Sequence, residues 1–189
     1  EAATRELGIQ TPTGSAHKEW VGNAAAHGHA MTVFAQLIVN GASHGVHAFY
    51  VPVRHADGGM RAGVRIADTG HKEGLNGVDN GRIWFDQVRV PREHLLNRFG
   101  DVSPDGSYTS PIENPAKRFF TMIGTLVGGR ITIGLSALSA VKSALTIAIR
   151  YGNRRRQFGE PGQAETPLPD YRPHQRRLRP ALATSIVLD

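Results

Sequence analysis

The hydrophobic period changes once along this chain, and that change constrains the fold more than any other feature. Up to about residue 90, runs rich in β-branched and aromatic residues, such as 31–39 and 46–53, lie between glycine-rich turns. This spacing is typical of an antiparallel β-sandwich or barrel. Beyond residue 115 the apolar residues step by three and four, which predicts a long helix from about Ala116 to Tyr151. The predicted class is α+β, an antiparallel β-sandwich or barrel followed by long helices of an incomplete helical bundle.

The same change predicts the domain boundary. We expect a β domain at residues 1–112 and the first helices of a helical domain at residues 113–189. A proline-rich link at residues 161–169 precedes a second helix from about Asp170. Because the chain starts at Glu1 and ends on an apolar run without a helix stop signal, we interpret it as a fragment, truncated in both domains.

One strand is marked by the turn residues before it. Residues 75–81 contain two Asn-Gly steps, which favour left-handed backbone angles and predict consecutive tight turns. Residues 82–90 then alternate in polarity and predict a single strand, which Pro91 ends because it has no amide to donate.

The positive charge is confined to the C-terminal part. The chain carries a net charge of +6, but residues 113–189 hold 12 Lys and Arg against 5 Asp and Glu, whereas residues 1–112 hold 10 against 11. Most of these cations are arginines, which suit bidentate phosphate contacts, so an anionic partner is one interpretation and a solvated helix face is the other. Among the arginines of residues 150–179, only Tyr151, Phe158 and Tyr171 could stack on bases, so we predict no nucleic-acid binding.

Several other kinds of chemistry lack their residues. The chain has no cysteine, which excludes disulfides and thiolate chemistry. His27, His29, His44 and His47 lack a carboxylate at ligand spacing, so no metal site is predicted. No uninterrupted apolar stretch approaches the roughly 20 residues of a membrane span, and no glycine-rich dinucleotide fingerprint, P-loop or nucleophile elbow is present.

Trp20 begins the first candidate cofactor segment. It lies two residues before Gly22 and three before Asn23. A tryptophan beside small residues at a strand end offers a flat apolar wall with exposed backbone amides, which suits a planar ring with polar edges such as an isoalloxazine. The alternative is a core tryptophan followed by a turn.

A second candidate segment follows the long helix. Arg155, Gln157 and Phe158 precede Gly159, so a guanidinium, an amide and an aromatic ring stand before a glycine turn. Together they could clamp a pyrophosphate and a nearby ring. Cations at a helix C-terminus are also favoured by the helix dipole alone, which is the alternative.

Glycines interrupt the predicted long helix near Arg130. Each weakens a helix by up to roughly 1 kcal/mol relative to alanine. We therefore expect another helix or a ligand to approach them closely. They are Gly124, Gly128, Gly129 and Gly134.

These segments carry a family resemblance. Residues 70–100, the Trp20 segment and the Arg-x-Gln-Phe-Gly string at 155–159 resemble the acyl-CoA oxidases, and the resemblance runs over essentially the whole chain. It implies a homodimeric FAD enzyme that converts acyl-CoA to trans-2-enoyl-CoA and reduces O2 to H2O2 in fatty acid β-oxidation.

The resemblance also implies roles for single residues. Trp20, Gly22 and Asn23 match the strand that contacts the flavin. The second set reaches the FAD of the partner subunit, and it consists of Arg155, Gln157 and Phe158. Arg130 matches an arginine near the substrate.

No catalytic residue is expected in this chain. The resemblance places the catalytic glutamate beyond Asp189, so we predict that the 189 residues alone are inactive. An acyl-CoA dehydrogenase is one alternative, although Val127 stands where dehydrogenases often have an acidic residue; a non-catalytic flavin-binding remnant is the other. The arginine and alanine usage suggests a GC-rich bacterial genome and hence the cytoplasm, whereas a eukaryotic origin would suggest the peroxisome.

Overall fold

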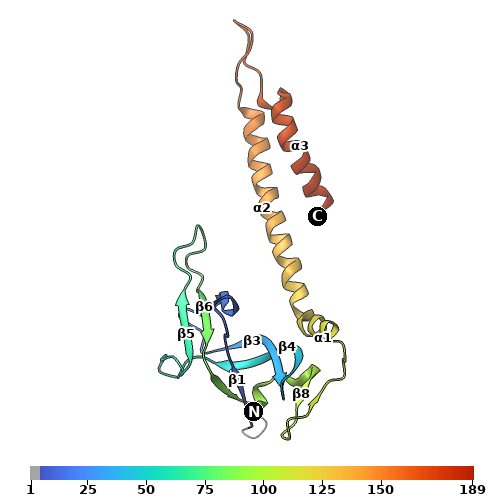
Figure 1. Ribbon diagram of the computed structural model, residues 1–189. Helices are drawn as coiled ribbons and strands as arrows, with labels where there is room; N and C mark the ends of the chain where they lie inside the picture. Colours follow the sequence, from blue (N-terminus) through green and yellow to red (C-terminus); the bar gives the residue numbers. More distant parts are fainter. Residues whose placement is uncertain (1–4) are drawn as a thin grey trace. The chain divides into compact units, whose positions relative to one another are not determined.

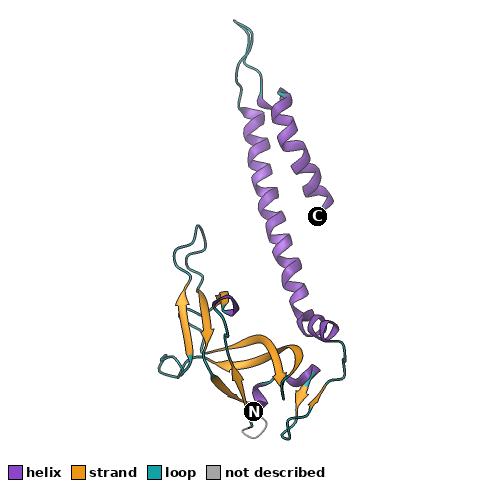
Figure 2. Cartoon of the chain, viewed as in Figure 1, coloured by secondary structure: helices purple, strands orange, loops and turns teal. Residues whose placement is uncertain are grey.

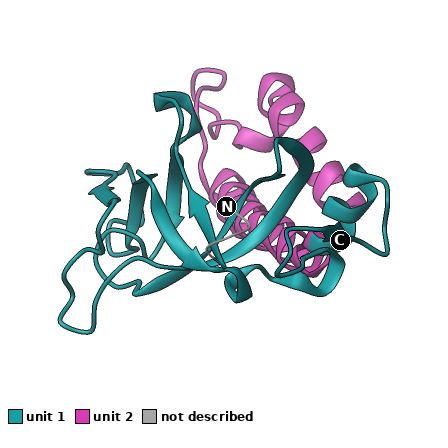
Figure 3. Ribbon diagram, turned by 60° about the horizontal axis from the view of Figure 1, so that its bottom comes forward, with its two compact units in different colours: residues 1–122 teal, residues 123–189 magenta. Residues whose placement is uncertain are grey.

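The structure, a computed structural model, describes residues 5–189 and divides into two compact units (Figure 3). Unit 1, Glu1–Met122, carries the strands, and unit 2, Ile123–Asp189, is helical (Figure 2). The boundary between the units lies after helix α1 (Pro115–Met122), because α1 packs on a strand of unit 1. The sequence-based boundary at residue 112 stays a prediction.

The described strands of unit 1 pair only antiparallel, in four small sheets. Two sheets contain the candidate segment and its neighbours: β2 (Lys18–Gly22), β6 (Asn80–Phe85) and β5 (Val64–Asp68) in that order, and the hairpin of β3 (Ala30–Val39) and β4 (Ala42–Pro52). The other two pair β1 (Glu6–Ile9) with β7 (Val88–Pro91), and β8 (Asp101–Val102) with β9 (Tyr108–Thr109).

This architecture confirms the α+β class. Antiparallel sheets are followed by a long helix, as the change of hydrophobic period predicts (Figure 1). The sheets do not close into a barrel within residues 5–189, so the barrel version of the prediction is wrong.

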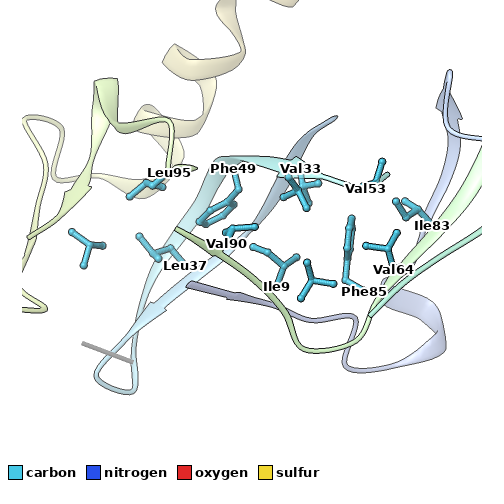
Figure 4. Close-up of a cluster of buried hydrophobic side chains, with 13 residues drawn as sticks. Ile9, Val33, Leu37, Phe49, Val53, Val64, Ile83, Phe85, Val90 and Leu95 are labelled. Atoms are coloured by element: carbon cyan, nitrogen blue, oxygen red, sulfur yellow. The ribbon is translucent and has the colours of Figure 1, made fainter. Parts of the chain in front are cut away.

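One apolar cluster holds the sheets of unit 1 together (Figure 4). Alternate residues of the strands point into it, which is the period of two expected for half-buried strands. Its buried members are Ile9, Val33, Leu37, Phe49, Val51, Val53, Val64, Ile83, Phe85, Val88, Val90, Leu95 and Val102.

The β3–β4 hairpin follows directly from its turn residues. Asn40 and Gly41 both have left-handed backbone angles, with φ of 50° and 79°. This pair forms the two-residue turn whose twist matches antiparallel strands. The strands predicted at 31–39 and 46–53 are confirmed, and they pair with each other.

The strand predicted at residues 82–90 is two strands. β6 ends at Phe85 and β7 begins at Val88, because the backbone turns at Gln87, where φ is 50°. The buried set therefore shifts from odd to even positions across this kink. The turn predictions were partly wrong as well: a turn closes between Leu75 and Val78, but Asn80 already lies in β6.

The helix predicted from Ala116 to Tyr151 has a break. α1 ends at Met122, a 3-10 turn occupies Ile123–Leu126, and α2 runs over Val127–Arg154. Within unit 1, α1 is tethered by Arg118, whose buried guanidinium donates to the carbonyls of His44 and Ile112.

Unit 2 is a helix pair. α3 (Arg172–Val187) begins close to the predicted Asp170 and packs beside α2 (Figure 1). Much of α2 stays exposed, and its apolar side chains include Ile131, Ile133 and Ile147. By length and composition alone, the helical stretch Pro115–Arg154 could cross a membrane, although Arg130 and Lys142 interrupt its apolar residues.

Candidate functional site

Trp20 lies on an irregular part of β2. The β2–β6 register jumps from Lys18 to Val21, so Glu19 and Trp20 have no paired residue in β6. Trp20 has a φ of 57°, and its side chain is 62% exposed. The alternative of a core tryptophan is therefore wrong, and the indole presents a free apolar surface.

The backbone that follows is a closed loop. Asn23, with a φ of 59°, begins the β2–β3 loop, residues 23–29. Every amide from residue 23 to 28 donates within the protein: Asn23 to the Asp79 carbonyl, Ala24 to the Val21 carbonyl, Gly28 to the Asn23 carbonyl, and residues 25–27 to the Asp79 carboxylate. The expected exposed amides are thus absent from residues 23–28, and the apolar wall is what remains.

Asp79 and Arg54 build this loop, and both are buried. The Asp79 side chain is 6% exposed, and Arg54 is 6% exposed. Burial raises the pKa of Asp79, but hydrogen bonds from the amides of residues 26, 27 and 25 and from the His27 imidazole outweigh it and hold the pKa below its ordinary value. The sequence analysis missed both residues, because Asp79 reads as an ordinary turn residue and its acceptor role depends on a loop more than fifty positions earlier.

The second segment forms a short hairpin at the end of α2. The Gln157 amide donates to the Thr166 carbonyl at 3.0 Å, the Thr166 amide donates to the Phe158 carbonyl at 2.7 Å, and the Tyr171 hydroxyl donates to the Gln157 carbonyl at 2.5 Å. Arg155 donates to the Gln157 side-chain oxygen at 2.6 Å. The arginine hairpin, residues 154–168, therefore has a defined backbone.

The arginine hairpin leaves two of the predicted site residues, Arg155 and Phe158, exposed. Phe158 is 69% exposed, with a φ of 60°. Arg155 has donors left after its bond to Gln157, since a guanidinium carries five N–H groups. A second arginine, Arg156, donates to the Glu165 carbonyl at 3.0 Å and helps to close the hairpin. The chemistry of this surface suits an anion beside a ring.

Arg130 is isolated on α2. Its side chain is exposed, and no hydrogen bond or ion pair involves it within residues 5–189. A Cβ added to either neighbouring glycine, Gly128 or Gly129, would enter open space, and the same holds for Gly124 and Gly134. The close approach expected there does not come from residues 5–189.

His44 and His47 of unit 1 have structural partners. His47 is buried, its Nε2 lies 2.9 Å from the Tyr108 hydroxyl, and His44 stacks on the Tyr108 ring. Residues 5–189 contain no group of three or more His, Cys, Asp or Glu side chains placed to hold a metal ion.

The chain is similar to known proteins over its whole length. Residues 123–189 match the family model described as the acyl-CoA oxidase C-alpha1 domain. Acyl-coenzyme A oxidase 3 of Arabidopsis thaliana, named as peroxisomal, is 50% identical over 186 residues, which cover 98% of this chain. The crystal structure of acyl-CoA oxidase 3 from Yarrowia lipolytica matches 100% of this chain with a TM-score of 0.86 and 38% identity.

The chain belongs to the acyl-CoA oxidase family.

The match covers part of each relative. The chain spans 28% of the length of the Arabidopsis acyl-CoA oxidase and 27% of that of the Yarrowia structure. A structure of acyl-CoA oxidase-2 from Caenorhabditis elegans, described as bound with FAD, ascaroside-CoA and ATP, matches 100% of this chain and 28% of its own, with a TM-score of 0.83 and 33% identity.

The relatives correct one expectation. We expected a bacterial cytoplasmic protein from residue usage, but the acyl-CoA oxidases that it matches include a plant enzyme named as peroxisomal. The cytoplasmic expectation is not supported, because residue usage reports genome composition and not compartment. The eukaryotic, peroxisomal alternative is the one that the relatives favour.

Proposed function

We propose that this protein acts as an FAD-dependent acyl-CoA oxidase, which converts acyl-CoA and O2 into trans-2-enoyl-CoA and H2O2 in fatty acid β-oxidation. The observation that carries the proposal is the 50% identity to a named acyl-CoA oxidase over 98% of this chain. The FAD named with the C. elegans structure supports the choice of cofactor.

The residues of β2 suit a flavin. The exposed indole of Trp20 lies where the pairing of β2 with β6 is interrupted. A planar ring could therefore lie against it without breaking a strand pairing. Gly22 adds no side chain and Asn23 turns the backbone into the β2–β3 loop. We assign Trp20, Gly22 and Asn23 to the isoalloxazine side of the cofactor.

The arginine hairpin suits the other parts of FAD. Arg155 and Gln157 are already paired, which lowers the entropy lost when they bind a pyrophosphate, and Phe158 offers a ring for stacking. We assign Arg155, Gln157 and Phe158 to the FAD of a partner subunit in a homodimer. Arg130 is assigned to the acyl-CoA, since it is exposed and has no partner within residues 5–189.

When bound, FAD would accept the substrate's β-hydride and return the electrons to O2. The chain's own residues would hold the ring in place and shield one of its faces from water. None of the glutamates here suits the removal of the α-proton, so we assign that base to a residue outside these 189. The complete active site therefore needs a base that these 189 residues do not supply.

The compartment and the apolar helix surface fit the same proposal. We place the protein in the peroxisome, as the name of the Arabidopsis relative suggests. The apolar surface of α2 is assigned to packing against other helices and not to lipid, because all of α2 lies in the segment that matches the C-alpha1 domain.

The test uses the protein expressed from its complete gene and purified without added cofactor. We expect a flavin absorbance band that bleaches when palmitoyl-CoA is added without oxygen. Admission of air should restore the band and release one H2O2 per turnover.

Two results would overturn the proposal. A band that stays bleached in air would indicate an acyl-CoA dehydrogenase, which passes its electrons to an electron-transfer flavoprotein. A protein without any flavin band, even after incubation with FAD, would indicate a non-catalytic remnant.

A further inference from the structure

The Asp79 carboxylate fills a concave set of amides in the β2–β3 loop. Its Oδ1 accepts the Ala25 amide at 2.9 Å, and its Oδ2 accepts the amides of Ala26 and His27, both at 3.0 Å. Successive amides that point to one place form an anion-binding concavity. Here the anion is a side chain of the protein itself, which arrives from the segment just before β6.

Arg54 holds the carbonyl side of the same loop. Its Nη1 donates to the Gly28 carbonyl at 2.5 Å, and its Nη2 donates to the carbonyls of Ala24 and Ala25, both at 2.8 Å. A lysine could not reproduce this arrangement, because it has one nitrogen on a flexible stem in place of a planar fork. Arg54 follows β4, so a second strand contributes to the fixing of the loop.

Close packing leaves the loop little room to move. Ala24 is fully buried, and a Cβ on Gly81 would lie 2.9 Å from the Ala25 nitrogen and 3.0 Å from the Ala24 Cβ. The loop thus rests directly on β6 at a position where only a glycine fits. The anion, the cation and this contact act on residues 24–28, which continue directly from Trp20 and Asn23.

The geometry points to a positioning role: Arg54 and Asp79 fix the β2–β3 loop before any ligand arrives, and so set the backbone of Trp20 and Asn23 for the flavin. This inference rests on the proposed FAD-binding function. Neither side chain needs to touch the cofactor. Their effect passes through the loop, since the left-handed angles of Trp20 and Asn23 are backbone conformations that unrestrained L-residues adopt only rarely.

The test changes each residue in the protein expressed from its complete gene. Asp79→Asn keeps the shape but turns one acceptor into a donor, and Arg54→Lys keeps the charge but loses the fork. In the apoprotein, we expect both variants to speed hydrogen exchange at amides 24–28 by about tenfold or more, and in FAD titrations to raise the dissociation constant by a similar factor.

Matched controls separate positioning from general destabilisation. Arg118→Lys changes another buried arginine, which donates to the carbonyls of His44 and Ile112 and not to the β2–β3 loop. Asp105→Asn changes a carboxylate that accepts the Ser107 amide in the β8–β9 turn. Both controls should leave FAD affinity and exchange at residues 24–28 within about twofold of the wild type, even if Arg118→Lys lowers the melting temperature.

The outcomes distinguish this inference from the proposed function. If the wild type binds FAD but Asp79→Asn and Arg54→Lys bind it as tightly, or lose affinity only as much as Arg118→Lys, the positioning role is wrong while the proposed function stands. If the wild type binds no FAD, the proposed function fails and the positioning role fails with it. Should Arg54→Lys not fold, Asp79→Asn with its Asp105→Asn control decides.

Discussion

At the scale of single residues, the exposed aromatic side chains separate binding from stability. Trp20 and Phe158 are 62% and 69% exposed, so neither supports the core of its unit. The buried charges Arg54 and Asp79 are the opposite case, because they stabilise a loop through backbone hydrogen bonds. The exposed aromatic side chains are thus available for a ligand, whereas the buried charges fix the loop that follows Trp20.

Replacement of Trp20 by alanine should weaken FAD binding without unfolding the protein. Because the indole is largely exposed, we expect the free energy of unfolding to change by less than about 0.5 kcal/mol. Loss of a stacking surface should raise the FAD dissociation constant by about tenfold. Denaturant unfolding and flavin-fluorescence titration measure the two effects. Trp84→Ala is the control, since it changes the other tryptophan of the chain; unchanged FAD affinity in Trp20→Ala would exclude a flavin contact there.

His47 should make unit 1 less stable in mild acid. Its Nδ1 lies 3.0 Å from the Gly45 carbonyl, which can only accept, so Nδ1 carries the proton and Nε2 accepts from Tyr108. Burial lowers the pKa of His47 below 6.5, so the unfolded chain takes up the proton first. The stabilisation is present above pH 6.5 and is lost as the pH falls from there through the folded-state pKa.

The check on His47 compares thermal unfolding of the wild type and His47→Gln from about pH 8 to pH 5. The amide of glutamine can donate to Gly45 and accept from Tyr108, but it does not titrate. We expect the melting temperature of the wild type to fall more steeply below pH 6.5 than that of the variant. Parallel curves would show that His47 is not the responsible group.

At the scale of elements, the sequence predicted what depends on local pattern. The β3–β4 strands, the long helical stretch and the class of the fold follow from alternation, a period of three to four and turn chemistry. The kink between β6 and β7 was not predictable in this way. It is held by acceptors from elsewhere, because the Asp86 amide donates to the Gly63 carbonyl and the Gln87 amide to the Gln10 side chain.

The site divides along the same line. The sequence located Trp20 and the arginine hairpin, because both carry distinctive residue types in a short span. It did not indicate that the amides after Trp20 already donate to Asp79, nor that Arg54 donates to the carbonyls of the same loop. Those contacts join segments more than twenty-five and fifty positions apart, and no local pattern encodes them.

Alanine at Gly129 should stabilise α2 in the 189-residue chain. Its Cβ would meet no described atom within 4 Å, so the helix propensity of alanine should add about 0.5–1 kcal/mol to the free energy of unfolding. Gly152→Ala is the matched control on the same helix, since its Cβ would lie 3.1 Å from the His174 ring and should cancel the gain. Denaturant unfolding compares the two, and equal effects would contradict the packing described here.

At the scale of the whole molecule, we propose that the 189 residues contribute contacts to the cofactor but no base for the α-proton. We therefore expect the purified 189-residue chain to produce no H2O2 from palmitoyl-CoA, even with added FAD, while the protein from the complete gene does. A coupled peroxidase assay on both samples measures this. Peroxide from the shorter chain above the level of free FAD would place a sufficient base among these residues.

The Asp79 bonds also predict how the molecule responds to salt. Dissolved ions screen charges in contact with water, but they act weakly on a carboxylate that is buried against amides. The arginines at 154–156, in contrast, are exposed to the solution. Rising ionic strength should therefore weaken only the binding of an anionic ligand to the arginine hairpin, while the conformation of the backbone around Trp20 should not change. The slope of FAD affinity against salt would then report one of the two contact regions by itself, without any substitution.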